Sequence, residues 1–267
     1  MSTASRSPVA SRPPKPRPRI SAWIAAAAVI AITVWAGVGM GFDLRPLFTD
    51  LDRGWFIIRR FLSPNWSFIP ATLGPWFETL SIAVIASIVG CGVALVLAML
   101  TSTVTSRSRA VSQITKAVLS VVRSLPDVGW GLLFVAFVGV GSLAGILALV
   151  MFNIGIAAKL TGETIDAVDR GPLEAADAAG ANIVQRATST VVPQILPNYY
   201  SYSLYVFELN MRASIVLGFV GAGGIGSRIN VELSRFNYEN VSAIIVMIFA
   251  VVFVLDAVSR ELRKRLV

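Results

Sequence analysis

The chain has 267 residues, of which 55% are apolar and 14% are charged, and its mean hydropathy is +0.72. Soluble domains carry about 25% charged residues, and a chain this apolar has too little polar surface to cover a soluble core. Histidine is absent and cysteine occurs once, which excludes histidine-based triads, His–Cys zinc sites and disulfide frameworks. We therefore expect an all-α polytopic membrane protein with no catalytic residue and no metal site. The excess of 23 Lys and Arg over 15 Asp and Glu is then a topology feature rather than an indication of nucleic-acid binding.

The N-terminal region predicts a tail, one membrane span and an external loop. Residues 1–21 are rich in Pro and Arg, which predicts a disordered basic cytoplasmic tail. The apolar run in residues 22–42 is longer than the apolar part of a secretory signal, so we predict a retained extra transmembrane helix. Residues 43–75 contain Trp55, Trp66 and other aromatic residues, a pattern typical of an external loop with an interfacial helix.

Five further spans are expected in residues 76–260. The uncharged run from 128 to 158 would extend about 46 Å as one helix, too long for a single crossing of a hydrocarbon core about 30 Å thick. The sequence GVGS at 139–142 is the natural break, and it divides this run into two spans joined by a tight turn. In chain order, the six predicted spans cover residues 22–42, 79–106, 117–138, 142–158, 199–220 and 241–258.

The basic residues predict the orientation. With a cytoplasmic N-terminus, sixteen Lys and Arg residues fall in the inside segments and six in the outside loops. This distribution follows the positive-inside rule. We therefore predict a multi-pass protein of the cytoplasmic (inner) membrane, with both termini, including the tail 261–267, in the cytoplasm.

The inside loop 169–197 begins with the pattern of a short helix. Pro172 suits the first turn of a helix, with Gly171 or Asp169 as its cap. Glu174 then lies in the first turn, where a negative charge interacts favourably with the helix dipole. The run LEAADAA has high helix propensity, so this part of the loop is expected to be helical.

The second half of the same loop predicts another short helix. Gly180 interrupts the first helix, and ANIVQRAT resumes the helical pattern at an angle. Pro193 and Pro197 accompany the return to the membrane. The result is a helix–turn–helix knob outside the bilayer, whose small residues allow a partner surface to approach closely. Periodicity alone leaves an ordinary connecting loop as the alternative.

This loop resembles the EAA motif of permease subunits of ATP-binding-cassette importers, written EAA, three residues, Gly, nine residues, Ile-x-Leu-Pro. Glu174 and Gly180 match at the expected spacing, whereas Thr190 stands for the Ile and Val192 for the Leu. The resemblance implies that the knob is a coupling helix, which docks into a groove on the ATPase subunit. The residues that it assigns to coupling are Glu174, Ala175, Ala176, Asp177, Gly180 and Pro193.

The resemblance narrows to the phosphonate importer permeases. Residues 123–127, RSLPD, resemble their R-[ST]-x-P element, and residues 204–226 are similar to the stretch after their coupling loop. Asp127 stands where a Glu is expected, and Asn153 where a His is expected. The resemblance implies a homodimer, each copy with a five-helix type I importer core and an extra N-terminal helix. It also implies two ATPase subunits that hold ATP and Mg, an external solute-binding protein and surrounding membrane lipids as partners, and no cofactor in this chain.

Polar residues inside the predicted spans have two interpretations. Glu208, Asn210 and Arg212 lie near the middle of the fifth span, where charges are costly and usually face a polar cavity or one another. Glu208 and Arg212 are four residues apart and so share a helix face. They either form a neutralised pair or line the substrate path, with Arg212 donating to a phosphonate group. Asp256 is expected to pair with a neighbouring Arg rather than to bind substrate.

Two other groups of residues complete the candidate sites. Arg123, with Ser124 and Pro126, forms either an inner gate or a structural link. The sequence GAGGIG at 221–226 matches a dinucleotide-binding pattern, but it ends a membrane span without a strand–turn–helix unit around it. We expect instead an irregular glycine turn at the outer end of the helix, formed by Gly221, Gly223, Gly224 and Gly226.

These features predict the permease subunit of an ATP-driven importer for phosphonates or a related phosphorus oxyanion. The subunit itself performs no bond chemistry. The alternatives are the same architecture importing phosphate, phosphite or an amino acid, and an ion-coupled secondary transporter that needs no ATPase. A membrane enzyme is disfavoured because the spans contain no His and no clustered carboxylates.

Overall fold

The computed structural model describes residues 20–43, 45–106 and 108–265, and these residues contain helices but no strand. The predicted tail 1–21 lies almost entirely outside the described residues, as do the last two residues of the tail 261–267. Five described helical segments are long and apolar enough to cross a membrane, and a sixth is added if the bent pair α5–α6 counts as one span. The prediction of an all-α polytopic membrane protein is confirmed.

The described residues divide into two units at Trp55 and Phe56. In the first unit, α1 (Ile20–Gly39) is a continuous apolar helix in which no side chain is buried, as expected of the extra span. The short α2 (Pro46–Thr49) follows, and α3 (Leu51–Phe61) begins in this unit and ends in the next. Along α3, charged residues alternate with exposed apolar side chains such as Trp55 and Ile58. This amphipathic pattern suits the predicted interfacial helix.

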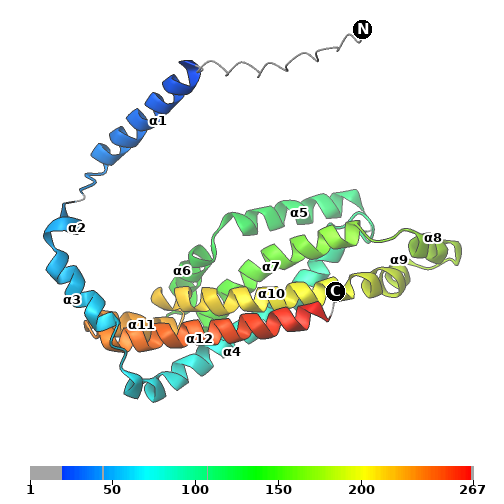
Figure 1. Ribbon diagram of the computed structural model, residues 1–267. Helices are drawn as coiled ribbons and strands as arrows, with labels where there is room; N and C mark the ends of the chain where they lie inside the picture. Colours follow the sequence, from blue (N-terminus) through cyan, green and yellow to red (C-terminus); the bar gives the residue numbers. More distant parts are fainter. Residues whose placement is uncertain (1–19, 44, 107, 266–267) are drawn as a thin grey trace, which may run out of the picture. The chain divides into compact units, whose positions relative to one another are not determined.

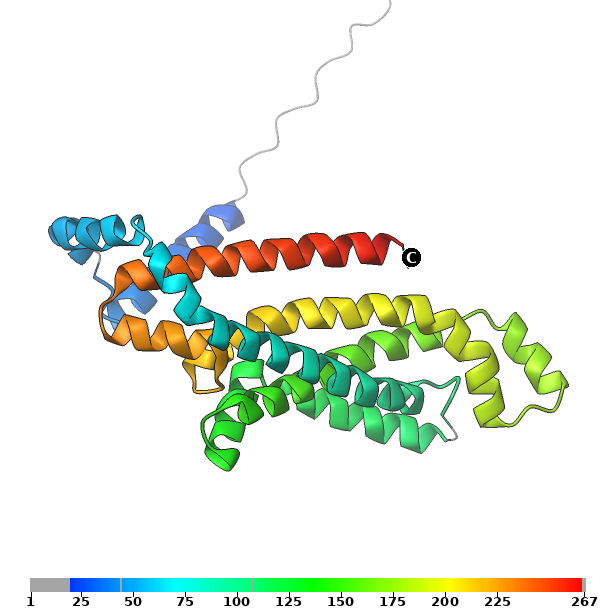
Figure 2. The ribbon, with the colours of Figure 1, turned by 90° about the horizontal axis from the view of Figure 1, so that it is seen from below.

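The second unit is a helix bundle in which α7 packs along α4 and α10 lies against both. Its helices are η1 (Trp66–Phe68), α4 (Ile69–Thr101), α5 (Arg109–Ser124), α6 (Asp127–Val138), α7 (Ser142–Asp166), α8 (Gly171–Ala178), α9 (Ile183–Arg186), α10 (Val192–Phe219), α11 (Gly224–Ser234) and α12 (Tyr238–Lys264). Within this unit, α8 and α9 project from one end, and α6 and α11 lie at the other (Figures 1 and 2).

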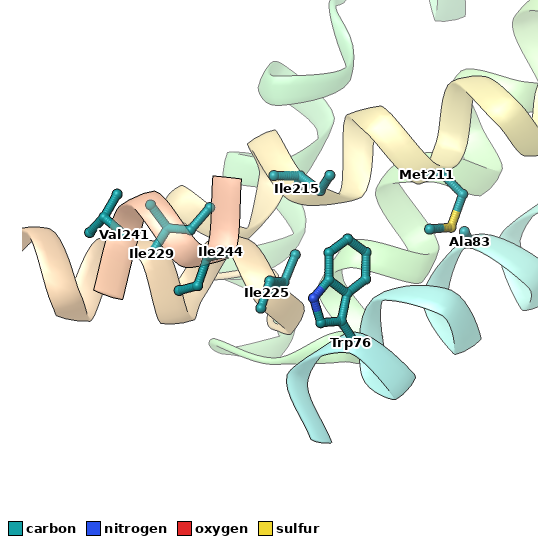
Figure 3. Packing of buried hydrophobic residues seen from close by; sticks show 8 residues of the cluster. All are labelled: Trp76, Ala83, Met211, Ile215, Ile225, Ile229, Val241 and Ile244. Atoms are coloured by element: carbon teal, nitrogen blue, oxygen red, sulfur yellow. The ribbon is translucent and has the colours of Figure 1, made fainter. Parts of the chain in front are cut away.

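Buried apolar clusters follow one another along the bundle. At the end that holds α11, Trp76 of α4 packs with Ile215 of α10 and Ile225 of α11, and Val241 of α12 belongs to the same cluster (Figure 3). At the opposite end, Leu173 of α8 packs with buried residues of α4, α7 and α10. The outward faces of the bundle carry many exposed apolar side chains, which a bilayer covers in a membrane protein.

The largest differences from the predicted spans concern α4, the α5–α6 pair and α11. Helix α4 begins at Ile69, ten residues before the predicted start, and its 33 residues extend about 50 Å. The third span is not straight, because α5 and α6 meet at 85° around Pro126, which lacks the N–H needed to continue the helix. Helix α11 was not predicted. The break at GVGS is confirmed, since α6 ends at Val138 and α7 begins at Ser142.

The connection from the knob into the membrane is helical throughout and includes both prolines. After α9, residues Ala187–Val191 form a π-helical turn that leads directly into α10. Pro193 occupies the first turn of α10, and Pro197 lies inside that helix. The wide turn occurs immediately before the proline that cannot donate a backbone hydrogen bond.

Candidate functional site: the projecting loop and the polar groups of the bundle

The projecting loop forms the predicted helix–turn–helix. Helix α8 begins at Gly171 with Pro172 in its first turn, but its N-cap is Arg170, so the predicted cap at Gly171 or Asp169 is wrong in position. The Asp169 carboxylate still contributes, because its Oδ1 accepts a hydrogen bond of 3.0 Å from the Gly171 N–H. That acceptor satisfies a backbone donor that the helix itself leaves open.

Gly180 ends α8 in the left-handed conformation, with φ of +77°. The N–H of Gly180 donates to the Asp177 carbonyl at 3.1 Å, and that of Ala181 to the Ala176 carbonyl at 3.0 Å. These two bonds are the Schellman motif, which favours glycine at this position because a side chain there is strained. A Cβ on Gly180 would meet no atom within 4 Å, so the backbone angle and not space restricts this position.

The second helix of the loop has a capping box that the sequence analysis missed. The Asn182 side chain accepts from the backbone N–H groups of Val184 and Gln185, at 3.0 and 2.9 Å, and the Gln185 side chain accepts from the Asn182 N–H at 2.9 Å. The sequence signature of Asn followed three residues later by Gln was available to find it. The turn of the knob is therefore defined by local hydrogen bonds on both sides.

Arg186, another residue that the sequence analysis missed, joins the knob to the bundle. Its guanidinium lies 3.2 Å from the Asp177 carboxylate and donates to the Val104 carbonyl at 2.6 Å. One helical turn before Asp177, Leu173 is buried in the apolar cluster at that end of the bundle. Helix α8 is thus attached to the bundle directly through Leu173 and indirectly through Arg186, which contacts both Asp177 and Val104.

The remaining residues of the predicted coupling set lie on the surface of the knob. Glu174, Ala175 and Asp177 are exposed, and Ala176 is half-buried. Pro193 is exposed at the start of α10. The exposed face of α8 therefore consists of small side chains and carboxylates, which leaves room for a partner surface to approach.

The polar residues of α10 do not form one group. Asn210 is fully buried on the side facing α4, where its Nδ2 donates to the Ser87 hydroxyl at 2.7 Å. Glu208 and Arg212 face α12 instead, and Arg212 lies 2.8 Å from Glu208. The expected pairing of Asp256 with an arginine is present, since Arg212 lies 2.8 Å from Asp256 as well. Arg263 of α12 adds a further contact of 3.1 Å to Glu208.

Arg212 and Asp256 also border an apolar groove of about 490 Å³ between α10 and α12. The Arg212 side chain is 49% exposed there. The neutralised-pair interpretation of Glu208 and Arg212 therefore describes their geometry, whereas the substrate-path role of Glu208, Asn210 and Arg212 stays a prediction.

The element around Arg123 lies where α5 bends into α6. The Arg123 side chain lies directly on Gly155 of α7, where a Cβ would come within 2.6 Å of the Arg123 Cγ. Its guanidinium donates to the Ser120 hydroxyl at 3.2 Å. Ser124 donates to the carbonyl of Val121 at 2.7 Å, and Pro126 is the N-cap of α6. This placement agrees with both predicted roles of Arg123, an inner gate and a structural link.

The glycine-rich segment contains the predicted irregular turn, but the turn is shorter than expected, because α11 begins at Gly224 and includes Gly226. Gly221, Gly223 and Gly224 have positive φ angles of 98°, 81° and 70°, and Gly226 lies inside α11. Gly226 permits the crossing of α10 and α11, because a Cβ on Gly226 would overlap the Ile215 carbonyl oxygen. The turn also accepts a hydrogen bond from the GVGS break, since the Gly141 N–H donates to the Gly221 carbonyl at 2.8 Å.

Asn153 and Asp127, the two residues that differ from the pattern of the phosphonate importer permeases, both form hydrogen bonds in the structure. Asn153 is buried and donates from Nδ2 to the Ala86 carbonyl at 2.9 Å, which ties α7 to α4. Asp127 lies in the first turn of α6 and accepts from the Val128 N–H. Cys91, the one cysteine of the chain, is buried in an apolar cluster. No group of residues suited to a metal ion occurs in the part of the chain that the structure describes.

The chain is similar in sequence to membrane components of transport systems. The family model described as binding-protein-dependent transport system inner membrane component matches residues 92–267. The phosphite transport system permease protein PtxC of Stutzerimonas stutzeri is 38% identical over 207 residues, which cover 76% of this chain and 74% of the relative. The phosphate-import permease protein PhnE of Mycolicibacterium smegmatis is 31% identical over 94% of this chain, and the match spans 47% of that relative.

A putative cryptic phosphonate transport system permease protein, PhnE2 of Escherichia coli, is 40% identical over 45% of this chain and 99% of the relative. Among solved structures, a chain of the MetNI methionine ATP-binding-cassette transporter aligns with a TM-score of 0.65. That alignment covers 76% of this chain and 99% of the other at 17% identity, so it shows the fold alone. The predicted type I importer fold is confirmed by this likeness.

Proposed function

This chain belongs to the family of binding-protein-dependent transport system inner membrane components, and from that premise we propose that it carries phosphonates or a related phosphorus oxyanion into the cell. It is a multi-pass permease subunit of an ATP-binding-cassette importer. The observation that supports the substrate class is its likeness to permeases named for phosphite, phosphate and phosphonate transport.

The proposed assembly contains two copies of this chain, two ATPase subunits that bind ATP and Mg, and an external solute-binding protein. The knob formed by α8 and α9 docks on the ATPase subunit, and Glu174 and Gly180 belong to that contact. Anchoring of the knob by Leu173 and Arg186 supports this role, because closure of the ATPase subunits then moves the helices of the bundle as rigid bodies. ATP hydrolysis takes place in the partner subunits.

We propose that the knob and both termini face the cytoplasm. Within the second unit, the C-terminal end of α12 lies at the same end as α8 and α9 (Figures 1 and 2). Arg260, Arg263, Lys264 and Arg265 gather near that end of α12, in agreement with the positive-inside rule. The glycine turn and α11 then lie at the external end.

Uptake of a labelled alkylphosphonate tests the substrate class. Cells that lack this chain are compared with cells in which it is restored, with excess unlabelled phosphate or phosphite as competitor. Uptake that needs the chain and resists phosphate and phosphite supports phosphonate as the solute. If phosphate or phosphite abolishes the uptake, the substrate is instead an inorganic oxyanion. If the chain supports no uptake of alkylphosphonate, phosphate or phosphite, the proposed substrate class is wrong.

The energy source is tested in the same cells. Deletion of the ATPase partner is expected to abolish chain-dependent uptake. Uptake that persists without that partner, and that collapses when the ion gradient is dissipated, would favour a secondary transporter instead.

A further inference from the structure

A charged cavity of about 300 Å³ lies between α4, α5 and α7. Its lining includes three cations, namely Lys116 and Arg123 of α5 and Lys159 of α7. Two carboxylates, Glu163 and Asp166, belong to the same lining, so the cavity carries a net positive charge. This site is separate from the exposed face of the knob and from the groove beside Arg212.

The two carboxylates neutralise these cations weakly. Lys159 lies 3.8 Å from Glu163, and Lys116 lies 4.0 Å from Asp166, which are distances at the outer limit of an ion pair. The other oxygen of Asp166 accepts from the Ser102 hydroxyl and from the Thr103 N–H, so this carboxylate is largely committed to the end of α4. Each ammonium group therefore retains donors that these carboxylates do not use.

Arg123 has the largest unused donor capacity in the cavity. A guanidinium has five N–H donors, and within the described residues its one hydrogen bond is to the Ser120 hydroxyl, at 3.2 Å. Gly155 supports the aliphatic part of the side chain and determines where it lies. The guanidinium is thus positioned by packing on α7 rather than by a carboxylate.

We propose that this cavity is a binding site for a phosphorus oxyanion, held by Arg123, Lys116 and Lys159. A guanidinium offers paired donors that match two oxygens of such an anion, while each ammonium acts as a point charge. The anion is either free phosphate or phosphonate on the side of the knob, or the headgroup of an anionic phospholipid. The presence of an anion site follows from charge and geometry, and the choice of a phosphorus oxyanion rests on the proposed function.

Equilibrium dialysis of radiolabelled inorganic phosphate against the full-length chain in neutral detergent tests the free anion. The chain is purified without its ATPase partner, because nucleotide sites also bind phosphate. Arg123→Gln and Lys159→Gln are each expected to weaken binding about tenfold or more, since each removes a charge-assisted contact. Lys264→Gln is the matched control, because Lys264 is paired with Glu261 at a similar 3.9 Å but lies outside the cavity. Its phosphate affinity is expected to equal that of the native chain.

Phospholipid nanodiscs test the second source. Preferential retention of phosphatidylglycerol over phosphatidylcholine, lost in the two Gln variants and kept in Lys264→Gln, assigns the site to a lipid headgroup. If Arg123→Gln does not elute as a monodisperse protein, Arg123→Lys replaces it. That variant keeps the charge but loses the paired donors, so it is expected to bind the phosphate or lipid probe more weakly than the native chain.

The proposal is overturned if neither probe binds, or if binding is the same in the native chain and in the cavity variants. If the chain restores phosphonate uptake but binds neither probe, the proposed anion site is wrong and the proposed function stands. A chain that binds phosphate through these residues but restores no uptake keeps the site and contradicts the function.

Discussion

The guanidinium of Arg212 on α10 donates to both carboxylate oxygens of Asp256 on α12, at 3.0 and 2.8 Å. The same nitrogen also lies 2.8 Å from Glu208, and Arg263 contacts the other Glu208 oxygen at 3.1 Å. Two positive and two negative side chains thus join α10 to α12. Because α10 continues from the knob through the π-helical turn, this network links the last helix to the element that is proposed to receive the ATPase motion.

We expect Arg212→Gln and Asp256→Asn each to lower the thermal unfolding midpoint of the solubilised chain. The double variant is expected to lower it by about as much as the larger single effect, because both changes break the same contact. Arg265→Gln, which removes an exposed pair with Glu261, serves as the control and is expected to leave the midpoint unchanged. Fully additive shifts would contradict a shared network. A raised KM for uptake in Arg212→Gln with an unchanged midpoint would instead support the predicted substrate contact.

Gly180 provides a test of the knob that separates backbone strain from lost contacts. Gly180→Val is expected to reduce uptake and ATPase stimulation, because a β-branched residue in the left-handed region is disfavoured by about 1–2 kcal/mol. Gly180→Asn is the matched control, since asparagine tolerates this conformation and the space around the glycine is open. Both variants are measured for abundance in membranes, for uptake and for ATP hydrolysis. Equal uptake by the two variants at equal abundance would show that coupling does not depend on the left-handed backbone conformation at Gly180.

Gly226 tests the contact between α10 and α11. Gly226→Ala is expected to reduce the amount of folded protein sharply, because the added methyl group would overlap the Ile215 carbonyl oxygen and Gly218. Gly92→Ala is the control: Gly92 is also helical, a Cβ there meets no atom within 4 Å, and alanine is the better helix former. The measurement is the monodisperse fraction of each variant after solubilisation. A native yield from Gly226→Ala would show that the two helices can separate without cost.

Features that depend on neighbouring residues in the chain could be predicted. Hydropathy located the long helices, and the glycines of GVGS and GAGGIG indicated the turns around Gly141 and Gly221, because span length and left-handed backbone are local properties. The alternation of helix formers with Gly180 likewise predicted the two helices of the knob. The π-helical entry to α10 was not predicted, since helix propensity does not distinguish an α-helical turn from the wider π-helical turn.

Partners across helices were determined by packing. The spacing of Glu208 and Arg212 predicted their pairing, but the contact of Arg212 with Asp256 depends on α12 lying beside α10. Asn210 is two residues from Arg212, and yet it faces α4, because successive helix residues point in different directions. The anchoring of Arg186 on Val104 joins residues 82 positions apart. Hydropathy and residue spacing contain no information on such pairs, whereas the tertiary structure selects them by bringing specific helix faces into contact.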